Sequence, residues 1–361
     1  MPTAVNETDA VTSEHSEPAV PASRPPTLQD VADRAGFSRA LVSIVIRGVP
    51  GASETTRQRV LEVADQLGYR PDGRARLLAA GRSKLIGVTL GLDNPFHSDV
   101  AAGIYQAAEA SGYQVVLSAV TASRTAQQAV ETLLDYRCEA AVLVGPLVPV
   151  ASLLALTERL PVVVVGQSAR SRAADVVRVP AAVGLGLAVD HLVSLGHRRI
   201  THVDGGRAPG AVERRTGFTS AMRRHGLAGT ATIVRGGGDE EAGAAAAREL
   251  VDGGLPTAVI TYNDACAVGL LDMFVRLGVT VPGDVSVVGY DDSKVARLSY
   301  LRLTTVSQDG RRLAAVAVER LIERLDRQPD GRRATSELKR EVLVPPRLVV
   351  RATTAAVRQP G

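Results

Sequence analysis

The side chains best suited to binding a ligand either directly follow short apolar runs or begin the segment after such a run. These polar residues are Asn94, His97, Arg214, Asn263, Asp264, Asp291, Asp292 and Gln308. A guanidinium fork, carboxylates and amides together recognise hydroxyl groups. The set therefore suits a hydroxyl-rich ligand such as a sugar, with Phe96 as an apolar floor. Taken singly, each Asn or Asp is more typical of a loop cap.

A second candidate set surrounds a tight turn, Ala35-Gly36-Phe37-Ser38, between two short amphipathic segments. A helix-turn-helix needs a turn with Gly, a capped second helix, and a polar outer face on that helix that is free for the major groove. The residues on or near that face are Ser38, Arg39, Ala40, Ser43 and Arg47. The pattern predicts DNA binding, and a plain three-helix bundle with a solvated basic side is the alternative.

Three short helices are predicted to position this face. Their apolar positions are Leu28, Val31, Ala32 and Ala35, then Leu41, Val42, Val45 and Ile46, then Val60, Val63, Ala64 and Leu67. Ser38 and Ser53 are the predicted N-caps of the second and third helices. The predicted ends are Gly36, Gly48 and Gly68. Residues 27–84 hold ten basic and six acidic side chains, and this local excess suits a phosphate backbone.

From Leu85 onward, apolar strands alternate with amphipathic helices. The predicted strands are Leu85–Leu90, Val115–Val120, Ala140–Val144, Val162–Val165, Ile200–Val203, Ala258–Thr261 and Val285–Tyr290. The predicted helices are Val100–Ala110, Ala126–Tyr136, Ala181–Leu195, Val212–Arg224, Glu240–Val251 and Ala265–Leu277. Strands this continuously apolar are buried on both faces, which predicts parallel sheets covered by helices. The number of elements predicts two such sheets.

The bulk composition is that of a globular protein with more than one domain. The 361 residues are 45% hydrophobic and 22% charged, with a net charge of +4. Aromatic residues make up only 3% and Trp is absent, so aliphatic side chains must build the cores. Residues 1–26 show no periodicity and are predicted to be a disordered extension. Because no secretory signal or membrane-length apolar run is visible, we expect a cytoplasmic protein.

Cofactor, metal and catalytic chemistry find no support in the sequence. The run "GLGLAVD" at 184–190 falls inside a predicted helix, whereas a dinucleotide fingerprint joins a strand to a helix. The histidines lack metal-ligand spacing, and no nucleophile–base pair is visible. Cys138 and Cys266 lie far apart in apolar runs and are predicted to be buried, reduced thiols. We expect no cofactor, no metal and no enzyme activity.

Residues Thr27–Lys84 resemble the DNA-binding head of the LacI/GalR family of bacterial repressors. The resemblance continues in order through "NPF" at 94–96, "LGHRRI" at 195–200, "RRTGF" at 214–218, "PTAVITYNDACAVG" at 256–269, "VPGDVSVVGYDD" at 281–292, "LTTVSQD" at 303–309 and "LVVRATT" at 348–354. It implies an all-α, three-helix helix-turn-helix domain followed by a two-lobed α/β domain. The α/β domain would resemble periplasmic binding proteins, with parallel sheets and a ligand cleft between the lobes.

The resemblance implies a role for each surface position of the head. The residues nearest the base edges would be Arg39, Ala40, Ser43 and Ile44. Arg39 can form bidentate hydrogen bonds with guanine. The residues that touch the DNA backbone or brace the head would be Thr27, Leu28, Thr56, Tyr69 and Asp72. Relatives usually carry Arg in place of Ile44 and often Asn in place of Arg47. Since Ile44 cannot donate a hydrogen bond, their operator preference does not transfer to this chain at that base pair.

The resemblance also implies the domain boundaries. They are a disordered extension at 1–26, a DNA-binding domain at 27–70, a hinge at 71–84, an effector-binding domain at 85–354 and a tail at 355–361. The two lobes would span about 85–178 with 310–337, and 179–309 with 338–354. Pro71, Ala75, Arg76 and Leu78 match the family's hinge helix, which forms when two protomers meet on DNA. Leu78 would then wedge into the minor groove, with Ala75 allowing close approach; an ordinary linker leucine is the alternative.

The effector contacts that the resemblance implies are Phe96, His97, Arg214, Asn263, Asp291 and Gln308. The chain departs from its relatives around this cleft. Several relatives carry Asp or Arg in place of Gly166, and Asp-Asn in place of Pro180-Ala181, while Phe is frequent in place of His97. The effector therefore need not be a simple sugar.

These features predict a transcriptional repressor that binds a palindromic operator in double-stranded DNA and is controlled by a small, sugar-like effector. The segment after Arg351 is short and lacks a leucine heptad, which favours a homodimer over a tetramer. Two other classes compete with this prediction. A sugar-binding or transport receptor would share the sensor fold but would not need the helical head, and an enzyme would need a catalytic pair that the sequence does not display.

Overall fold

The structure is a computed structural model that describes residues 24, 26–70, 82–145, 149–166, 174–327 and 341–357. The chain divides into two compact units, Met1–Ala79 and Ala80–Gly361. Nearly all of the predicted extension lies outside the described residues, as do Asp72, Ala75 and Leu78 of the predicted hinge. The roles of these three residues stay predictions.

The first unit consists of α1 (Leu28–Ala35), α2 (Arg39–Ile46) and α3 (Glu54–Gln66). The N-caps are Thr27, Ser38 and Ser53, whose side chains accept backbone hydrogen bonds. Gly36 ends α1 at a φ of 75°, a conformation that glycine adopts without steric cost. The core consists of Val31, Ala32, Val42, Val45, Val60, Val63 and Ala64. The predicted helices, their serine caps and their apolar faces are confirmed.

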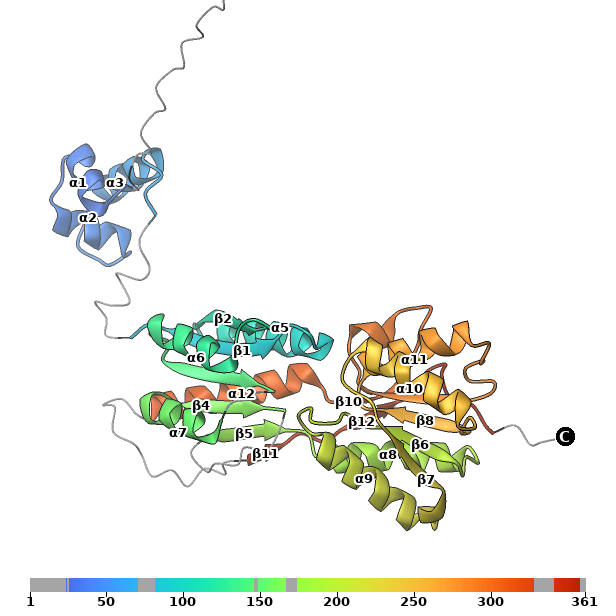
Figure 1. The fold of residues 1–361 in the computed structure, drawn as a ribbon. Coiled ribbons are helices and arrows are strands. Elements are labelled where there is room, and N and C mark those ends of the chain that lie inside the picture. The colour runs from blue at the N-terminus through green and yellow to red at the C-terminus, as the bar shows by residue number, and fades with distance from the viewer. Residues whose placement is uncertain are drawn as a thin grey trace, which may run out of the picture. The chain divides into compact units, whose positions relative to one another are not determined.

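The first lobe of the second unit contains one parallel sheet. Its strands are β1 (Leu85–Gly91), β2 (Gln114–Val120), β3 (Ala140–Val144), β4 (Val162–Val165), β5 (Asp175–Arg178) and β11 (Glu341–Leu343), in the order β11-β5-β4-β3-β1-β2. Helices α5 (Pro95–Ala110) and α12 (Gly310–Asp326) pack on one face, as Figure 1 shows. Helices α6 (Ala126–Asp135) and α7 (Val150–Arg159) pack on the other.

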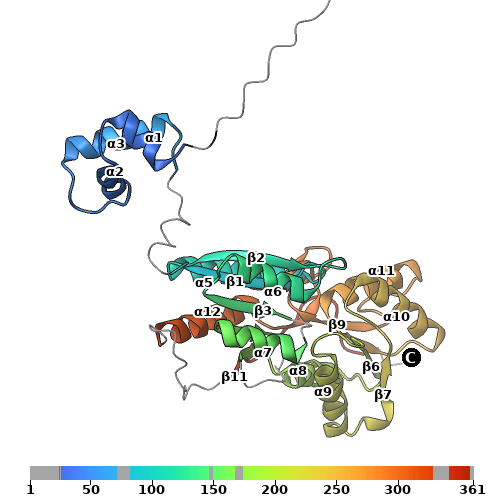
Figure 2. The same ribbon diagram turned by 60° about the vertical axis from the view of Figure 1, so that its left-hand side comes forward.

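The second lobe repeats this arrangement around a second sheet. Its strands are β6 (Ile200–Val203), β7 (Ala231–Val234), β8 (Ala258–Thr261), β9 (Ser286–Asp291), β10 (Thr304–Ser307) and β12 (Arg347–Val349), in the order β12-β10-β9-β8-β6-β7. Only β12 pairs antiparallel to its neighbour in this sheet as described. Helices α8 (Ala181–Ser194) and α9 (Ala211–Arg224) pack on one face, and α10 (Glu240–Asp252) and α11 (Asp264–Arg276) on the other (Figure 2). Short 3-10 turns lie at Ala228–Thr230 (η1) and Lys294–Arg297 (η2).

The predicted alternation of parallel strands and helices is confirmed, with small shifts at the element ends. Helix α5 begins at Pro95 rather than Val100, because the Asn94 side chain caps it. The prediction missed β5, β7, β10, β11, β12, α7 and α12. It also assigned 338–354 wholly to the second lobe, whereas β11 pairs with β5 in the first-lobe sheet. Strands β7, β11 and β12 lie at sheet edges or are partly exposed, so they lack the continuous apolar run that marks a buried strand.

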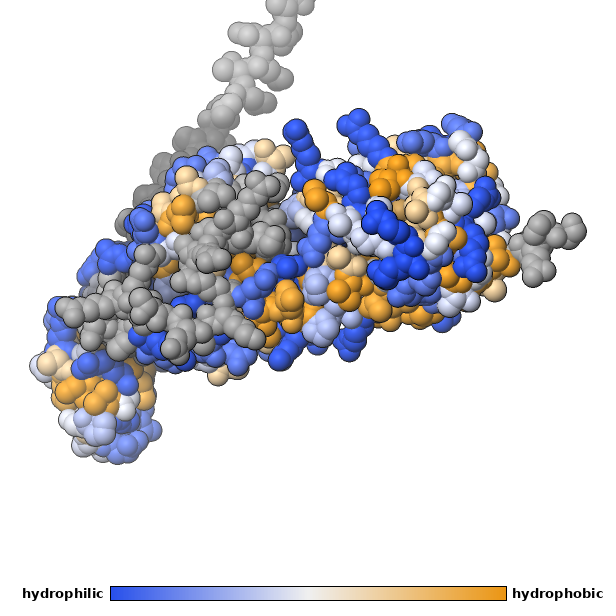
Figure 3. Space-filling model, turned by 90° about the horizontal axis from the view of Figure 1, so that it is seen from below, coloured by the Kyte–Doolittle hydropathy of each residue, from blue (hydrophilic) through white to orange (hydrophobic). Residues whose placement is uncertain are grey.

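The face of the second unit that Figure 3 shows is mixed in polarity. On the face shown in Figure 3, orange hydrophobic areas are interrupted by blue hydrophilic side chains. No helix within the described residues is both long and apolar enough to cross a membrane.

Candidate functional site

A cavity of about 540 Å³ lies between the two lobes of the second unit. The carboxyl ends of the strands surround it, which is where open α/β sheets bind ligands. All six predicted effector contacts line this cavity, namely Phe96, His97, Arg214, Asn263, Asp291 and Gln308. The structure thus brings together side chains that are more than two hundred residues apart in sequence.

Arg214 is held rigidly on the second-lobe wall. Its guanidinium lies over the Tyr262 ring at 4.3 Å and over the Tyr290 ring at 3.8 Å. Nη1 donates a hydrogen bond to the Tyr262 carbonyl, and Nη2 lies 3.8 Å from Asp291 Oδ1. These contacts already hold the guanidinium in one orientation, so little side-chain freedom is left to lose when a ligand binds. Arg214 can offer a fixed, charged donor to a ligand.

Asp291 supplies the matching acceptor. Gln308 Nε2 donates to Asp291 Oδ1 at 2.6 Å, which orients both side chains. Burial raises the pKa of Asp291, whereas the Arg214 guanidinium and the Gln308 amide act in the opposite direction. Arg214, Asp291 and Gln308 together present donors and acceptors at hydrogen-bond spacing, an arrangement that suits adjacent hydroxyl groups.

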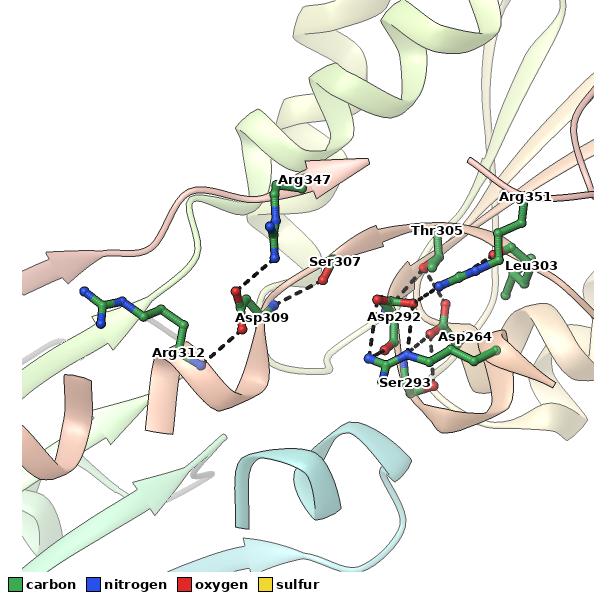
Figure 4. Close-up of polar contacts among 11 residues, drawn as sticks. Asp264, Asp292, Ser293, Leu303, Thr305, Ser307, Asp309, Arg312, Arg347 and Arg351 are labelled. Carbon is green, nitrogen blue, oxygen red and sulfur yellow. Dashed lines mark hydrogen bonds and ion pairs between the residues drawn. The ribbon is translucent and has the colours of Figure 1, made fainter. Parts of the chain in front are cut away.

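The turn that carries Asp291 is strained, and hydrogen bonds to a buried carboxyl group hold it in place. Asp291 and Asp292 have φ values of 118° and 53°, which side-chain-bearing residues rarely adopt. The buried Asp264 carboxylate accepts hydrogen bonds from the Ser293 backbone and hydroxyl and from Thr305 Oγ1, as Figure 4 shows. Burial raises the pKa of Asp264. Asp264 thus braces the turn and does not line the cavity.

Asp292 is held by two arginines. Arg351 Nη2 donates to Asp292 Oδ1 at 2.6 Å (Figure 4). Arg297 Nη2 donates to the Asp292 carbonyl at 2.6 Å. These two cations come from the C-terminal segment and from η2. They fix the backbone conformation that directs Asp291 toward the cavity.

Asn263 lines the cavity, but both of its polar side-chain atoms already have partners. Oδ1 caps α11 by accepting from the Cys266 backbone N–H at 2.9 Å, and Nδ2 donates to the Gly238 carbonyl at 2.8 Å. The simple capping role expected of an isolated Asn is therefore present. A ligand contact by Asn263 would use the remaining donor and acceptor capacity of its amide.

The first-lobe wall contains Phe96, His97 and Gly166. Phe96 is buried in the first-lobe core, where α5 meets α12. His97 Nδ1 lies 2.9 Å from the Gly91 carbonyl oxygen. A Cβ at Gly166 would meet no atom within 4 Å, so this position leaves open space in the wall. Pro180 and Ala181 begin α8 and are not among the residues around the cavity.

Several cavity residues escaped the sequence reasoning. Tyr262, Asp93 and Asp239 line the cavity and were not proposed as contacts. Their positions carry a usable signal, because each lies just after a strand or just before a helix at the ligand-binding edge of its sheet. Tyr262 in particular directly follows β8, in the run that also supplied Asn263.

The predicted DNA-reading residues share one face of α2. Ser38, Arg39, Ala40 and Arg47 are exposed, and Ser43 and Ile44 are half-buried. This face lies opposite Val42 and Val45, which enter the core. Arg47 Nε donates to the Ser43 carbonyl, so Arg47 folds back along its own helix. Thr27 is exposed, whereas Leu28, Thr56 and Tyr69 are half-buried.

The described residues contain no cluster of three or more His, Cys, Asp or Glu that could hold a metal ion. Cys138 and Cys266 are free and buried. Burial raises the pKa of the Cys138 thiol to about 11 and that of Cys266 to about 12. Both remain protonated near neutral pH and are therefore unreactive, as predicted for buried, reduced thiols.

Comparison with known proteins decides the family. Residues 27–72 match the bacterial regulatory proteins of the lacI family, and residues 189–354 match a periplasmic binding protein-like domain. The HTH-type transcriptional regulator GalR of Escherichia coli (strain K12) is 32% identical over 309 residues, which cover 84% of this chain and 90% of that protein. The chain belongs to the LacI family.

Solved structures of LacI-family regulators extend over both parts of the chain. A LacI transcriptional regulator from a Rhodococcus species is 44% identical, with a TM-score of 0.71, over 76% of this chain and 99% of that one. The lac repressor dimer bound to operator and the anti-inducer ONPF is 29% identical, with a TM-score of 0.78, over 92% of this chain and all of the other. This LacI-family chain is a DNA-binding transcriptional regulator with a two-lobed, periplasmic-binding-protein-like sensor domain.

Proposed function

We propose that this LacI-family regulator represses transcription by binding a near-palindromic operator as a homodimer, and that a small, hydroxyl-rich effector in the inter-lobe cavity controls this binding. The observation that carries the effector site is the convergence of all six predicted contacts on one cavity. The observation that carries operator binding is the exposed polar face of α2.

The head supports direct reading of DNA. Helix α2 offers an exposed Arg39 for guanine and a half-buried Ile44 for a thymine methyl. One head reads one half-site, so two heads related by a two-fold axis favour a palindromic sequence. The lac repressor, whose structure matches 92% of this chain, is a dimer on its operator.

The cavity supports a polar effector of sugar-like chemistry. Arg214, Asp291 and Gln308 form a pre-arranged set of donors and acceptors, and the rings of Phe96 and Tyr262 provide apolar surface beside them. An effector that contacts both lobes stabilises one relative arrangement of the lobes. It shifts DNA binding only to the extent that its affinity differs between the two states of the dimer.

The proposed regulator acts on chromosomal DNA in the cytoplasm and carries no enzyme activity. Its matched relatives are named as regulators. Prolonged incubation with neutral sugars, followed by chromatography of the mixture, should return each sugar unchanged. Conversion of any sugar would revive the enzyme alternative.

Selection from a library of random duplexes tests the DNA-binding proposal. We expect a near-palindromic consensus that the protein prefers over random duplex at physiological salt. Arg39→Lys keeps the charge but cannot form the bidentate hydrogen bonds of arginine. The variant should therefore lose base preference while retaining nonspecific affinity for DNA. Equal affinity of the wild-type protein for the selected and random duplexes would refute the proposal.

A further inference from the structure

The first-lobe wall of the cavity leaves one histidine nitrogen uncovered. Gly91 ends β1, Gly145 follows β3 and Gly166 follows β4, and all three line the cavity. A Cβ at Gly145 would lie 3.1 Å from His97 Nε2. Any larger residue at this position would therefore press on the nitrogen and screen it. With glycine there, His97 Nε2 remains accessible from the cavity.

The backbone fixes which nitrogen of His97 carries the proton. Nδ1 lies 2.9 Å from the Gly91 carbonyl oxygen, and a carbonyl oxygen can only accept. Nδ1 must therefore donate, which leaves Nε2 of the neutral ring as a bare acceptor. Among the described residues, no group forms a hydrogen bond with Nε2.

The surroundings keep the imidazole neutral. Burial lowers the pKa of His97, and it outweighs the bond to Gly91 and the Asp93 carboxylate, which act in the opposite direction. His97 also lies in the first turn of α5, where the free backbone N–H groups disfavour a positive charge. The other charged groups around the cavity are Arg214, Asp239 and Asp291, which belong to the second lobe.

We propose that His97 determines specificity at the first-lobe wall, where its bare Nε2 accepts a hydrogen bond from a hydroxyl group of a neutral effector. A phosphate or carboxylate oxygen at this end of the ligand would instead face two acceptors, Nε2 and the Asp93 carboxylate. Arg214 and Asp291, which line the second-lobe wall, would bind other hydroxyl groups of the same ligand. The inference rests on the proposed function, because it takes the cavity as the effector site.

The first experiment needs no ligand. Selective ¹⁵N labelling of histidine in the full chain, with His97→Phe to assign the signal, reports the protonation of each ring nitrogen by NMR. We expect a protonated Nδ1 and an unprotonated Nε2 at pH 7. A proton on Nε2 at pH 7 would overturn the proposal directly.

The second experiment measures binding of glucose, galactose, maltose, cellobiose and glucose 6-phosphate by calorimetry. We expect at least one neutral sugar to bind and the phosphate to bind more weakly. His97→Phe should weaken binding of that sugar about tenfold, the worth of one hydrogen bond. His97→Gln, which restores an acceptor, should recover most of the loss. Ser98→Ala, on the same helical turn but outside the cavity lining, is the matched control.

Acid should weaken sugar binding by the wild-type protein, because protonation of Nε2 removes the acceptor. His97→Phe should lose the part of this pH dependence that comes from Nε2, while the part that comes from Asp291, whose pKa burial raises, should remain. Urea unfolding of each variant reports on folding, since His97 belongs to the second compact unit and the DNA-binding head to the first.

The outcomes separate the two proposals. If no sugar binds to the wild-type protein and none alters operator binding, the sugar-sensor function fails and the inference fails with it. If a sugar binds and alters operator binding but His97→Phe binds it equally well, only the role of His97 is overturned. Binding of glucose 6-phosphate as tight as that of glucose would overturn the preference for a neutral ligand.

Discussion

Arg214 acts as a fixed donor because contacts within the protein hold its guanidinium in one orientation. Two aromatic rings and one carbonyl group hold its guanidinium, and the Asp291 carboxylate balances its charge. The adjacent Arg215 differs, since it is half-exposed and pairs with Asp204. Two neighbouring arginines on α9 therefore have separate roles that spacing alone could not distinguish.

Replacing Arg214 should uncouple the sensor from the DNA-binding head. Arg214→Ala is expected to abolish the response of operator binding to the effector while leaving basal operator binding intact, because the head folds as a separate unit. Mobility-shift titrations with and without effector measure both quantities. Arg215→Ala is the control, and an Arg214→Ala protein with an unchanged effector response would remove this residue from the site.

His202 should make the stability of the second lobe sensitive to acid. The ring is fully buried against Phe218, and burial lowers its pKa to about 4. The unfolded chain takes up a proton near pH 6.5, whereas the folded chain does so only near pH 4. The stabilisation is therefore complete above pH 6.5 and falls by about 3 kcal/mol as the pH drops to 4.

Urea unfolding at pH 7 and pH 5 of the wild-type protein and of His202→Gln tests this expectation. The variant should show the weaker loss of stability toward acid. The difference between the two proteins in this change of unfolding free energy isolates His202. Burial raises the pKa values of Asp264 and Asp291, which act in the opposite direction, but both residues occur in both proteins. Identical pH dependence in the two proteins would contradict the assignment.

At the scale of elements, the strand ends and the turns after them decide which side chains meet. The β9 turn directs Asp291 toward the cavity and Asp292 toward Arg351, because two consecutive residues adopt positive φ. The same carboxylate type, repeated in sequence, thus acquires two different roles. The alternation of strands and helices predicted this edge of the sheet, but it could not predict the local backbone conformation.

The hinge segment belongs to the same scale, and its test rests on sequence alone. Leu78→Ala should lower affinity for the selected operator by about tenfold or more, because an apolar wedge stabilises the bent duplex. Effector binding should be unchanged, since the predicted hinge at 71–84 lies outside the predicted effector-binding domain at 85–354. Fluorescence anisotropy with labelled operator measures the first quantity and calorimetry the second. An unchanged operator affinity would contradict the assignment of Leu78 as the wedge.

At the scale of the whole second unit, an ion pair between described residues joins the lobes. Arg178, at the end of β5 in the first lobe, donates to Glu213 on α9 of the second lobe at 3.1 Å. The Arg178 side chain is 16% exposed, and it also binds Glu341 on β11 within its own sheet. Glu213 is the residue next to Arg214. A contact that joins the lobes therefore adjoins the cavity.

Breaking this pair should shift effector affinity without touching the cavity lining. Glu213→Gln is expected to change affinity by up to about fivefold, the effect of a partly exposed ion pair on the arrangement of the lobes. The matched control is Glu341→Gln, which removes a bond within one lobe and should leave affinity unchanged. Calorimetry at low and high salt measures the effect, which should diminish as salt screens the pair. Equal shifts in both variants would argue against a link between the lobes.

The amino-acid sequence by itself determined the helices of the head, their serine caps, the buried parallel strands and the set of polar residues at the strand ends. These features follow from local periodicity, from capping chemistry and from the rule that parallel strands are buried. The short edge strands escaped prediction, because pairing with a neighbour defines them more than their own composition does.

Only the tertiary structure decided how the polar residues divide their roles. It placed Asp264 beneath the β9 turn as a brace, committed Asn263 to capping, and left Nε2 of His97 open beside Gly145. These outcomes depend on which groups meet across two lobes and on how each buried donor and acceptor finds a partner. Such pairing is a property of the packed chain, so no local pattern in the sequence could have specified it.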